Sequence, residues 1–211
     1  MRIQNICYDE KLRCFRFTLD DESELLVSYP AYNDLNLRVD DCLDEEKREL
    51  LRIEDLTNRA FFVACRYAVY QPRTKKEVRD RLLRERFPKD ISESVLEMLA
   101  AQHLLDDTAY ACRYAQDQSR IKHWSRRQIE SRLREKGLCG APLKEALVEV
   151  TDAQEADNVA FLYEKKYAQV PLNDVKSFQR VASALLRRGF STELVLSFLK
   201  QKRRETSDEY D

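Results

Sequence analysis

Side chains capable of covalent chemistry are few and scattered along the chain. The cysteines form no C-x-x-C pair and match no zinc-binding spacing, and disulfides are not expected in a reducing compartment. Cys112 and His103 are a conceivable nucleophilic pair, but Cys112 falls in a helical pattern that needs an inner face. The cysteines are therefore predicted to be small buried residues: Cys7, Cys14, Cys42, Cys65, Cys112 and Cys139.

Metal and phosphate chemistry receive no better support from the sequence. Asp106 and Asp107 are adjacent, but a hard cation needs several converging oxygen ligands, and such a pair before a helix more often caps it. The chain has 3 glycines and no G-x-x-x-x-G-K-[ST] loop to hold a nucleotide phosphate. The sequence therefore predicts no enzyme, no metal site and no cofactor.

Positive charge is the strongest chemical signal, and it is concentrated in residues 113–136. This stretch holds eight basic residues against three acidic ones. Arginine can fork onto carboxylate or phosphate, and Trp124 can stack on a base or anchor a protein interface. Alternatively, the arginines form a solvated face and Trp124 is a hydrophobic staple before Ser125. The candidate partner-binding residues are Arg113, Arg120, Lys122, Trp124, Arg126, Arg127, Arg134 and Lys136.

The distribution of charge and apolar residues bounds the class of protein. Residues 1–50 hold 7 basic and 13 acidic side chains, residues 51–151 hold 20 and 15, and residues 152–211 hold 10 and 10. A local positive region suits a polyanion or an acidic protein surface. No apolar run approaches the roughly 18 residues of a membrane helix, and the first residues do not resemble a signal peptide. A cytoplasmic protein is expected.

The elements that would position the basic residues are mainly helices. Residues 1–43 form an exception, because "RIQNICY", "LRCFRFTL" and "SELLVSY" alternate with period two and predict a small antiparallel β meander. From Asp44, a predicted N-cap, the apolar spacing becomes helical and continues to Pro72. Two capping boxes are predicted next, one at Thr74 with Glu77 and one at Asp90 with Glu93.

The helical part contains an internal repeat. "ACRYA" occurs at residues 64–68 and again at 111–115. Thr74, Ser125 and Ser177 are each predicted to begin the second helix of a three-helix unit. The turn after that helix falls at Arg86, Gly137 and Gly189. The prediction is a curved array of three tandem repeats, 44–103 with a lead-in helix, 104–151 and 152–201, followed by a disordered tail at 202–211.

The second repeat carries a resemblance to a known family. "LLDDTAYACRYAQDQSRIKHWSRRQIESRLREKGL" resembles the central signature of the bacterial RecX proteins. "PRTKKEVRDRL" in the first repeat and "VKSFQRVASALLRRGFS" in the third resemble their opening and closing units. Two positions depart from the family pattern, since "RIKHWS" lacks the frequent glycine and the first repeat has Arg86 at its turn. The matching residues of the central signature are Leu105, Asp106, Asp107, Tyr110, Gln128, Ile129, Leu133, Lys136 and Gly137.

The resemblance implies a regulator of RecA. RecX-like proteins are tandem three-helix repeats that bind RecA and its nucleoprotein filament and dampen its ATPase and strand-exchange activities in recombination, DNA repair and the SOS response. They are not enzymes. A monomer with weak direct DNA contact at most is expected. Two other hypotheses remain open, a helix-turn-helix DNA-binding protein and a scaffold whose N-terminal meander is the partner site.

Overall fold

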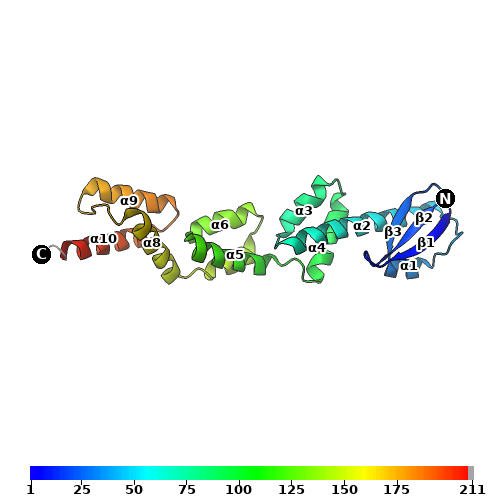
Figure 1. Ribbon diagram of the computed structural model, residues 1–211, viewed down its shortest axis with the longest axis horizontal. Helices are drawn as coiled ribbons and strands as arrows, with labels where there is room; N and C mark the ends of the chain where they lie inside the picture. The colour runs from blue at the N-terminus through cyan, green and yellow to red at the C-terminus, as the bar shows by residue number, and fades with distance from the viewer. Residues whose placement is uncertain (209–211) are drawn as a thin grey trace. The chain divides into compact units, whose positions relative to one another are not determined.

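The computed structural model describes residues 1–208, with side chains through Glu205, and the described chain is mainly helical (Figure 1). It divides into two compact units, Met1–Asp106 and the part that begins at Asp107. No helix in the described residues is long and apolar enough to cross a membrane. The first unit contains β1 (Ile3–Asp9), β2 (Cys14–Leu19), β3 (Glu24–Ser28), α1 (Tyr29–Leu35), α2 (Glu45–Tyr70), α3 (Lys75–Arg84) and α4 (Lys89–Ala101). The second contains α5 (Asp107–Lys122), α6 (Arg126–Glu135), α7 (Gly140–Val148), α8 (Asp152–Tyr167), α9 (Val175–Arg187) and α10 (Thr192–Asp208).

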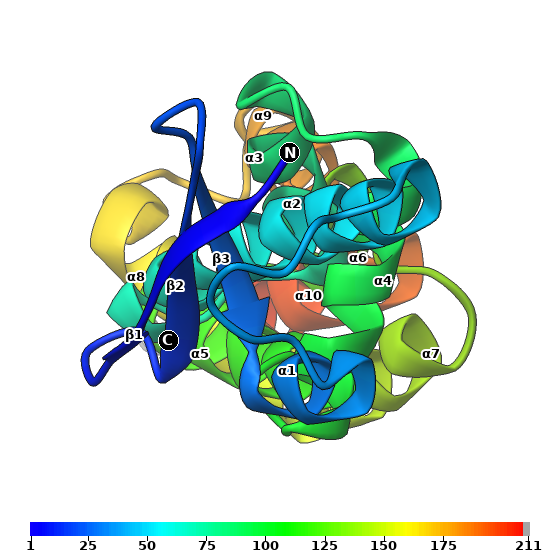
Figure 2. The same ribbon diagram turned by 90° about the vertical axis from the view of Figure 1, so that its right-hand side faces the viewer.

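The predicted β meander is confirmed. Its three strands are antiparallel in the order β1-β2-β3, and Figure 2 shows them beside one another. The alternation along β2 sends Phe17 and Leu19 into a core that also contains Leu51 of α2. A sheet this small is marginal alone, so α2 completes its apolar core.

Helix α2 joins the sheet to the first repeat as one continuous element. Asp44 caps it as predicted, because its carboxylate accepts from the backbone N–H of Lys47 at 2.8 Å. No glycine or proline interrupts Glu45–Tyr70. Leu51 therefore packs on the sheet, while Ala60 and Ala64 further along the same helix pack in the core of repeat 1. The lead-in helix and the first helix of that repeat are one helix.

Side chains of α2 also satisfy the outer edge of strand β3. The Asp55 carboxylate accepts from the Leu26 backbone N–H at 2.8 Å, and the Asn58 amide donates to the Leu26 carbonyl at 2.9 Å. Arg59 donates to both Asp55 carboxylate oxygens and to the Glu24 carbonyl. Because Asp55 and Asn58 are buried, these bonds replace the ladder that a fourth strand would supply.

Each of the three repeats has its own apolar core. Their second helices contribute equivalent residues, as the repeat spacing predicted. These residues are Val78 and Leu82 in α3, Ile129 and Leu133 in α6, and Val181 and Leu185 in α9.

The turn after each second helix depends on a residue in the left-handed backbone conformation. Gly137 and Gly189 have φ of 85° and 89°, and Arg86 adopts the same region at 66°. In the first repeat the Phe87 N–H donates to the Leu82 carbonyl, which closes the turn as a Schellman motif. Arg86 therefore adopts the left-handed conformation that glycine adopts in the other two repeats, and the turn forms in spite of this departure from the family pattern.

Two of the predicted helix starts are wrong. Thr74 and Ser125 are N-caps as predicted, but α4 begins after Pro88 with no side-chain cap. Its Glu93 carboxylate accepts from the Arg79 guanidinium of α3 at 2.6 and 2.9 Å, so it does not form the predicted capping box. Helix α9 begins at Val175 because Asp174, three residues before Ser177, accepts the Ser177 N–H at 2.8 Å.

The prediction of a disordered tail from residue 202 is also wrong for the described residues. Helix α10 continues to Asp208, and residues 209–211 lie outside the described part of the chain. Lys202 pairs with Glu205 one turn on and with Glu164 of α8, while Gln201 donates to Glu205. These charged contacts extend the helix without apolar periodicity.

The cysteines are less buried than predicted. Cys14 is buried and Cys65 and Cys112 are partly buried, whereas three others are exposed: Cys7, Cys42 and Cys139. Cys7 lies on a strand at the edge of the sheet, and Cys139 precedes the first residue of α7. Position in an element therefore decided exposure more than residue type did.

Repeats 2 and 3 meet through a polar joint inside the second unit. The Ser125 hydroxyl donates to the Arg188 carbonyl at 2.6 Å, and a Cβ built on Gly189 would lie 2.6 Å from that hydroxyl oxygen. Asn158 of α8 is fully buried and donates to Ser119 at 2.9 Å, while its amide oxygen lies 3.0 Å from Nδ1 of His123. Only a glycine fits at position 189 in this arrangement.

The first prediction concerns the edge of β3. Asp55→Ala leaves the Leu26 N–H without its acceptor and Arg59 without its carboxylate, so we expect the free energy of unfolding to fall by about 1–3 kcal/mol. Urea denaturation followed by circular dichroism measures this change. Asp34→Ala, at an exposed position on α1, is the control and should change stability by under about 0.5 kcal/mol. If Asp55→Ala and Asp34→Ala lowered the free energy of unfolding equally, the role proposed for Asp55 at the edge of β3 would be contradicted.

The second prediction concerns the joint. Gly189 and Gly140 both have positive φ, so an alanine at either position costs about 1 kcal/mol of strain. A Cβ at Gly140 meets nothing within 4 Å, whereas one at Gly189 collides with Ser125 and approaches Arg127 Cβ at 3.2 Å. Gly189→Ala should therefore lose about 1–3 kcal/mol more than Gly140→Ala in thermal or urea unfolding. If Gly189→Ala and Gly140→Ala lost similar stability, the contact between the Gly189 turn and Ser125 would not be tightly packed.

Candidate functional site

The predicted basic strip lies on α5, on α6 and in the turn between them. Three of its arginines are exposed and make no ion pair within the described part of the chain: Arg113, Arg120 and Arg127. Arg113 and Arg120 are two helical turns apart on α5, and Asp117 lies between them on the same side. These cations are available to an anionic partner.

Arg126 has a different role from the one predicted for it. Its guanidinium donates to the Val150 carbonyl and to the Asp152 carboxylate, both at 2.7 Å, and its backbone N–H donates to Glu155 at 2.8 Å. A second carboxylate contact, to Glu155, lies at 3.8 Å. Arg126 therefore ties α6 to the start of α8 and contributes to the joint between repeats 2 and 3.

The remaining basic residues of the strip are engaged but accessible. Arg134 pairs with Glu130 one helical turn earlier at 2.6 Å, in an exposed contact that contributes little to stability. Lys136 lies over the rings of Tyr110 and Tyr114, with its Nζ 5.4 and 5.9 Å from their centroids. An incoming anion can compete with such contacts.

Trp124 packs against the core of repeat 2 and is partly buried there. It directly precedes Ser125, whose hydroxyl accepts from the Gln128 N–H at 3.2 Å. Lys122 Nζ lies 5.2 Å from the Trp124 ring centroid. The structure thus places Trp124 as a packing residue that precedes the helix cap.

The residues between the two helices form the joint rather than a free loop. Backbone φ of 54° at His123 turns the chain after α5, and its ring stacks on Phe161 of α8 with centroids 3.7 Å apart. Tyr114 lies eleven residues before Ser125, whereas Tyr67 lies seven before Thr74, so repeat 2 has four more residues at this point. This longer segment ends in His123, which contacts repeat 3.

The structure adds two basic residues that sequence reasoning missed. Arg187 and Arg188 line the same open depression as Arg127 and Arg132. The "RRG" sequence before Gly189 is visible in the sequence, but nothing there shows that the end of α9 meets the start of α6. Only the packing of repeat 3 on repeat 2 brings these arginines together.

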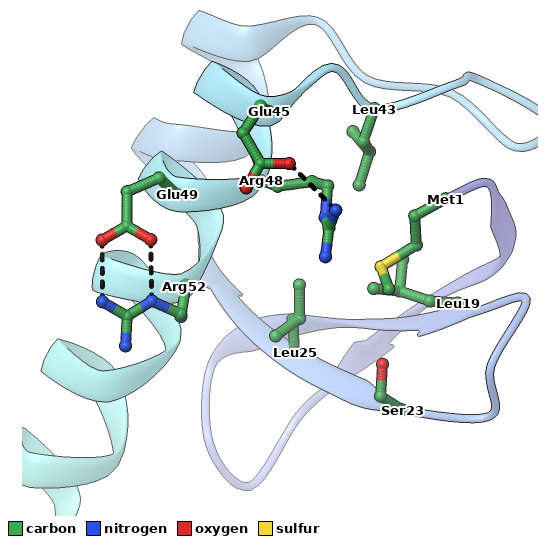
Figure 3. A pocket seen from close by; sticks show the side chains of 9 residues that line it. All are labelled: Met1, Leu19, Ser23, Leu25, Leu43, Glu45, Arg48, Glu49 and Arg52. Atoms are coloured by element: carbon green, nitrogen blue, oxygen red, sulfur yellow. Dashed lines mark hydrogen bonds and ion pairs between the residues drawn. The ribbon is translucent and has the colours of Figure 1, made fainter.

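A separate pocket of about 210 Å³ lies in the first unit, between the sheet and the start of α2 (Figure 3). Its charged side chains balance one another, since Arg48 pairs with Glu45 at 3.0 Å and Arg52 with Glu49 at 2.7 Å. Such a pocket suits an apolar side chain rather than an anion. Its apolar lining consists of Met1, Leu19, Leu25 and Leu43.

The pKa shifts in the described residues move away from neutrality. Hydrogen bonds from Arg52 and Arg79 lower the pKa of the Glu49 and Glu93 carboxyls. Burial raises the pKa of the Cys65 thiol, and a hydrogen bond to Glu135 raises the pKa of Arg132. Acid–base catalysis uses the opposite shifts, toward the working pH.

Comparison with known proteins identifies the repeats. Models of the first, second and third three-helix domains of RecX match residues 60–99, 106–147 and 152–199. Together they cover more than half of the chain, in the order of the three repeats.

Curated relatives extend the match. The regulatory protein RecX of Finegoldia magna is 27% identical over 203 residues, which covers 92% of this chain and 96% of that protein. That of Geobacillus thermodenitrificans is 25% identical over 193 residues, covering 90% and 72%. That of Levilactobacillus brevis is 29% identical over 170 residues, covering 78% of this chain and 63% of the relative.

Solved structures show the same fold. A crystal structure of regulatory protein RecX superposes with a TM-score of 0.79 at 24% identity, covering 95% of this chain and 98% of the other. That of RecX from Lactobacillus salivarius gives 0.65 at 24% identity, covering 71% and 97%. With three consecutive domain matches and relatives that share the whole repeat array, the chain belongs to the RecX family of regulatory proteins.

Proposed function

We propose that this chain binds RecA and its nucleoprotein filament and lowers the ATPase, recombination and strand-exchange activities of RecA. The observation that carries this proposal is the run of three consecutive RecX domains over residues 60–199. The proposal requires no catalytic group. It requires a surface that reaches several points on its partner through modest contacts, which tandem repeats supply.

The outer face of α5 is the contact surface that we propose for RecA itself. Ile121 is 72% exposed, a large apolar side chain left in water. Arg120 and Lys122 flank it on the same helix, Arg113 lies about two turns earlier, and Asp117 one turn earlier is the acidic residue among them. An apolar anchor with a basic rim suits an acidic patch on a protein. Arg126 is excluded from this surface because its charge is already paired inside the chain.

A helix-turn-helix reader of DNA bases receives less support. In that motif the helix after the turn enters the major groove and carries the base contacts. The corresponding helix α7, "GAPLKEALV", contains one lysine and one glutamate. The corresponding helix of the first repeat, α4, has Lys89 against three acidic residues. Neither helix has the basic excess that groove binding requires.

The third prediction tests the proposed function. Added to RecA from its own host, the protein should lower the rate of single-strand-dependent ATP hydrolysis. It should do so at concentrations where little of it binds bare single-stranded DNA, because the filament offers protein contacts as well as phosphates. Coupled ATPase assays and fluorescence anisotropy over a salt series measure the two effects. Tight sequence-specific binding to duplex DNA with no effect on RecA would overturn the proposal.

The fourth prediction tests the α5 face. Arg113→Glu with Arg120→Glu should raise the concentration needed for half-inhibition of RecA by about tenfold, since each reversal at a charged rim replaces attraction with repulsion. Helicity should stay unchanged because both side chains are exposed. Arg66→Glu with Arg84→Glu makes the same charge change at exposed positions of the first unit. An equal loss in this control would mean that bulk charge, not the α5 face, determines inhibition.

A further inference from the structure

The pocket between the sheet and the start of α2, which we call the sheet pocket, is apolar inside and charged around its edge (Figure 3). Its volume of about 210 Å³ is below the roughly 300–1,000 Å³ of sites for small organic ligands, and it suits a single side chain. The apolar side chains that line it are Met1, Leu19, Leu25 and Leu43.

The apolar walls of the sheet pocket are already in place. Leu19 and Leu43 are buried and belong to the core of the sheet. The Leu43 N–H donates to the Met1 carbonyl at 2.9 Å, which fixes the two residues beside each other. Met1 is nevertheless 37% exposed, so part of this apolar lining faces water. A preformed pocket reduces the ordering cost of binding.

The two chain segments that form the pocket are strongly acidic. Residues 19–25 and 43–52 together hold eight acidic and three basic side chains. All three basic side chains are paired with carboxylates on their own helix or at its cap: Lys47 with Asp44, Arg48 with Glu45 and Arg52 with Glu49.

Negative charge therefore remains around the pocket after these pairs are formed. Glu24 pairs with Arg16 of the neighbouring strand at 2.6 Å. The other carboxylates of the two segments make no ion pair within the described part of the chain: Asp20, Asp21, Glu22 and Glu46.

Three of these carboxylates belong to a well-ordered turn between β2 and β3. The Leu19 N–H donates to the Ser23 carbonyl at 2.9 Å, and the Glu22 N–H donates to the Leu19 carbonyl at 3.0 Å. Asp21 accepts from the Ser23 N–H at 3.0 Å. Leu19 and Ser23 both line the sheet pocket, so the turn holds its acidic residues next to it. Like charges held close together repel one another unless a cation lies between them.

We propose that the sheet pocket binds one apolar side chain of a short basic segment in a partner protein. An apolar centre with a polar rim is the usual anatomy of a protein interface, and a side chain that fills a pocket is its usual anchor. The unpaired carboxylates select a segment rich in lysine or arginine. They disfavour a nucleic acid strand and an anionic membrane surface, because either would add negative charge.

This contact goes beyond the proposed contact with RecA and has the opposite charge. The α5 face suits an acidic patch, whereas the sheet pocket suits a basic segment. The two proposals can fail separately, because binding to the sheet pocket is measured with peptides and with no RecA present.

The fifth prediction is a titration of the full chain with three fluorescein-labelled peptides at about 0.15 M salt. The peptide KKRLRKK supplies both an apolar side chain and positive charge, KKRSRKK lacks the apolar side chain, and EEDLDEE reverses the charge. KKRLRKK should bind about tenfold more tightly than KKRSRKK, because a buried leucine adds a favourable transfer free energy. EEDLDEE should not bind. Fluorescence anisotropy measures all three.

Two variants separate the apolar contact from the charge. Ser23→Trp places a large ring at an exposed position that lines the pocket, and should remove the preference for KKRLRKK over KKRSRKK. Asn33→Trp adds the same ring at an exposed position of α1 and should keep the preference. Asp20→Lys with Glu46→Lys should lower the affinity for both basic peptides by about tenfold.

The charge control is Glu10→Lys with Asp34→Lys, which makes the same charge change at exposed positions that do not line the pocket. Its affinity for KKRLRKK should fall by less than about threefold, because salt screens distant charges. Circular dichroism checks that each variant folds.

Four results would overturn the proposal. They are equal binding of KKRLRKK and KKRSRKK, binding of EEDLDEE as tight as that of KKRLRKK, a preference that survives in Ser23→Trp, and an equal loss of affinity in the charge control. Sedimentation that shows a dimer of this chain, lost in Ser23→Trp, would assign the pocket to a second copy and would also reject the proposal.

Discussion

The close approach of the Gly189 turn to the Ser125 hydroxyl determines how the second and third repeats meet. Several other contacts belong to the same joint. Arg126 can reach Asp152 only because the start of α8 lies beside the start of α6. The buried Asn158 can likewise reach Ser119. The positive depression between α6 and α9 is a further consequence, since it has no walls unless these two helices are held together.

The sequence predicted the helices, strands and repeats well, because each gives a characteristic spacing of apolar residues. The spacing of Val78, Ile129 and Val181 identified the repeats, and Thr74 and Ser125 were recognisable as caps by the residues that follow them. Local pattern failed where a distant group competed. Asp90 and Glu93 have the spacing of a capping box, but Glu93 bonds to Arg79 of another helix. A single sequence contains no sign of that competitor.

The candidate site was predicted in part for the same reason. A concentration of arginines in residues 113–136 is visible by counting, but the role of each depends on groups far along the chain. Arg126 lies 26 residues before Asp152, which pairs with it, while Arg127 lies 60 residues before Arg187 and shares only a surface with it. Arginine thus forms an ion pair within the chain at position 126 and is an exposed cation at position 127. No periodicity distinguishes these roles.

The unbroken course of α2 has a mechanical consequence. From Leu51 in the core of the sheet to Ala64 in the core of repeat 1, the helix rises about 20 Å with its backbone bonds continuous. The sheet and repeat 1 are thus packed on two parts of the same continuous helix. A partner that tilts the sheet would transmit torque to repeat 1 along this helix. The N-terminal sheet therefore cannot act as an independent attachment, because any force on it is also a force on the first repeat.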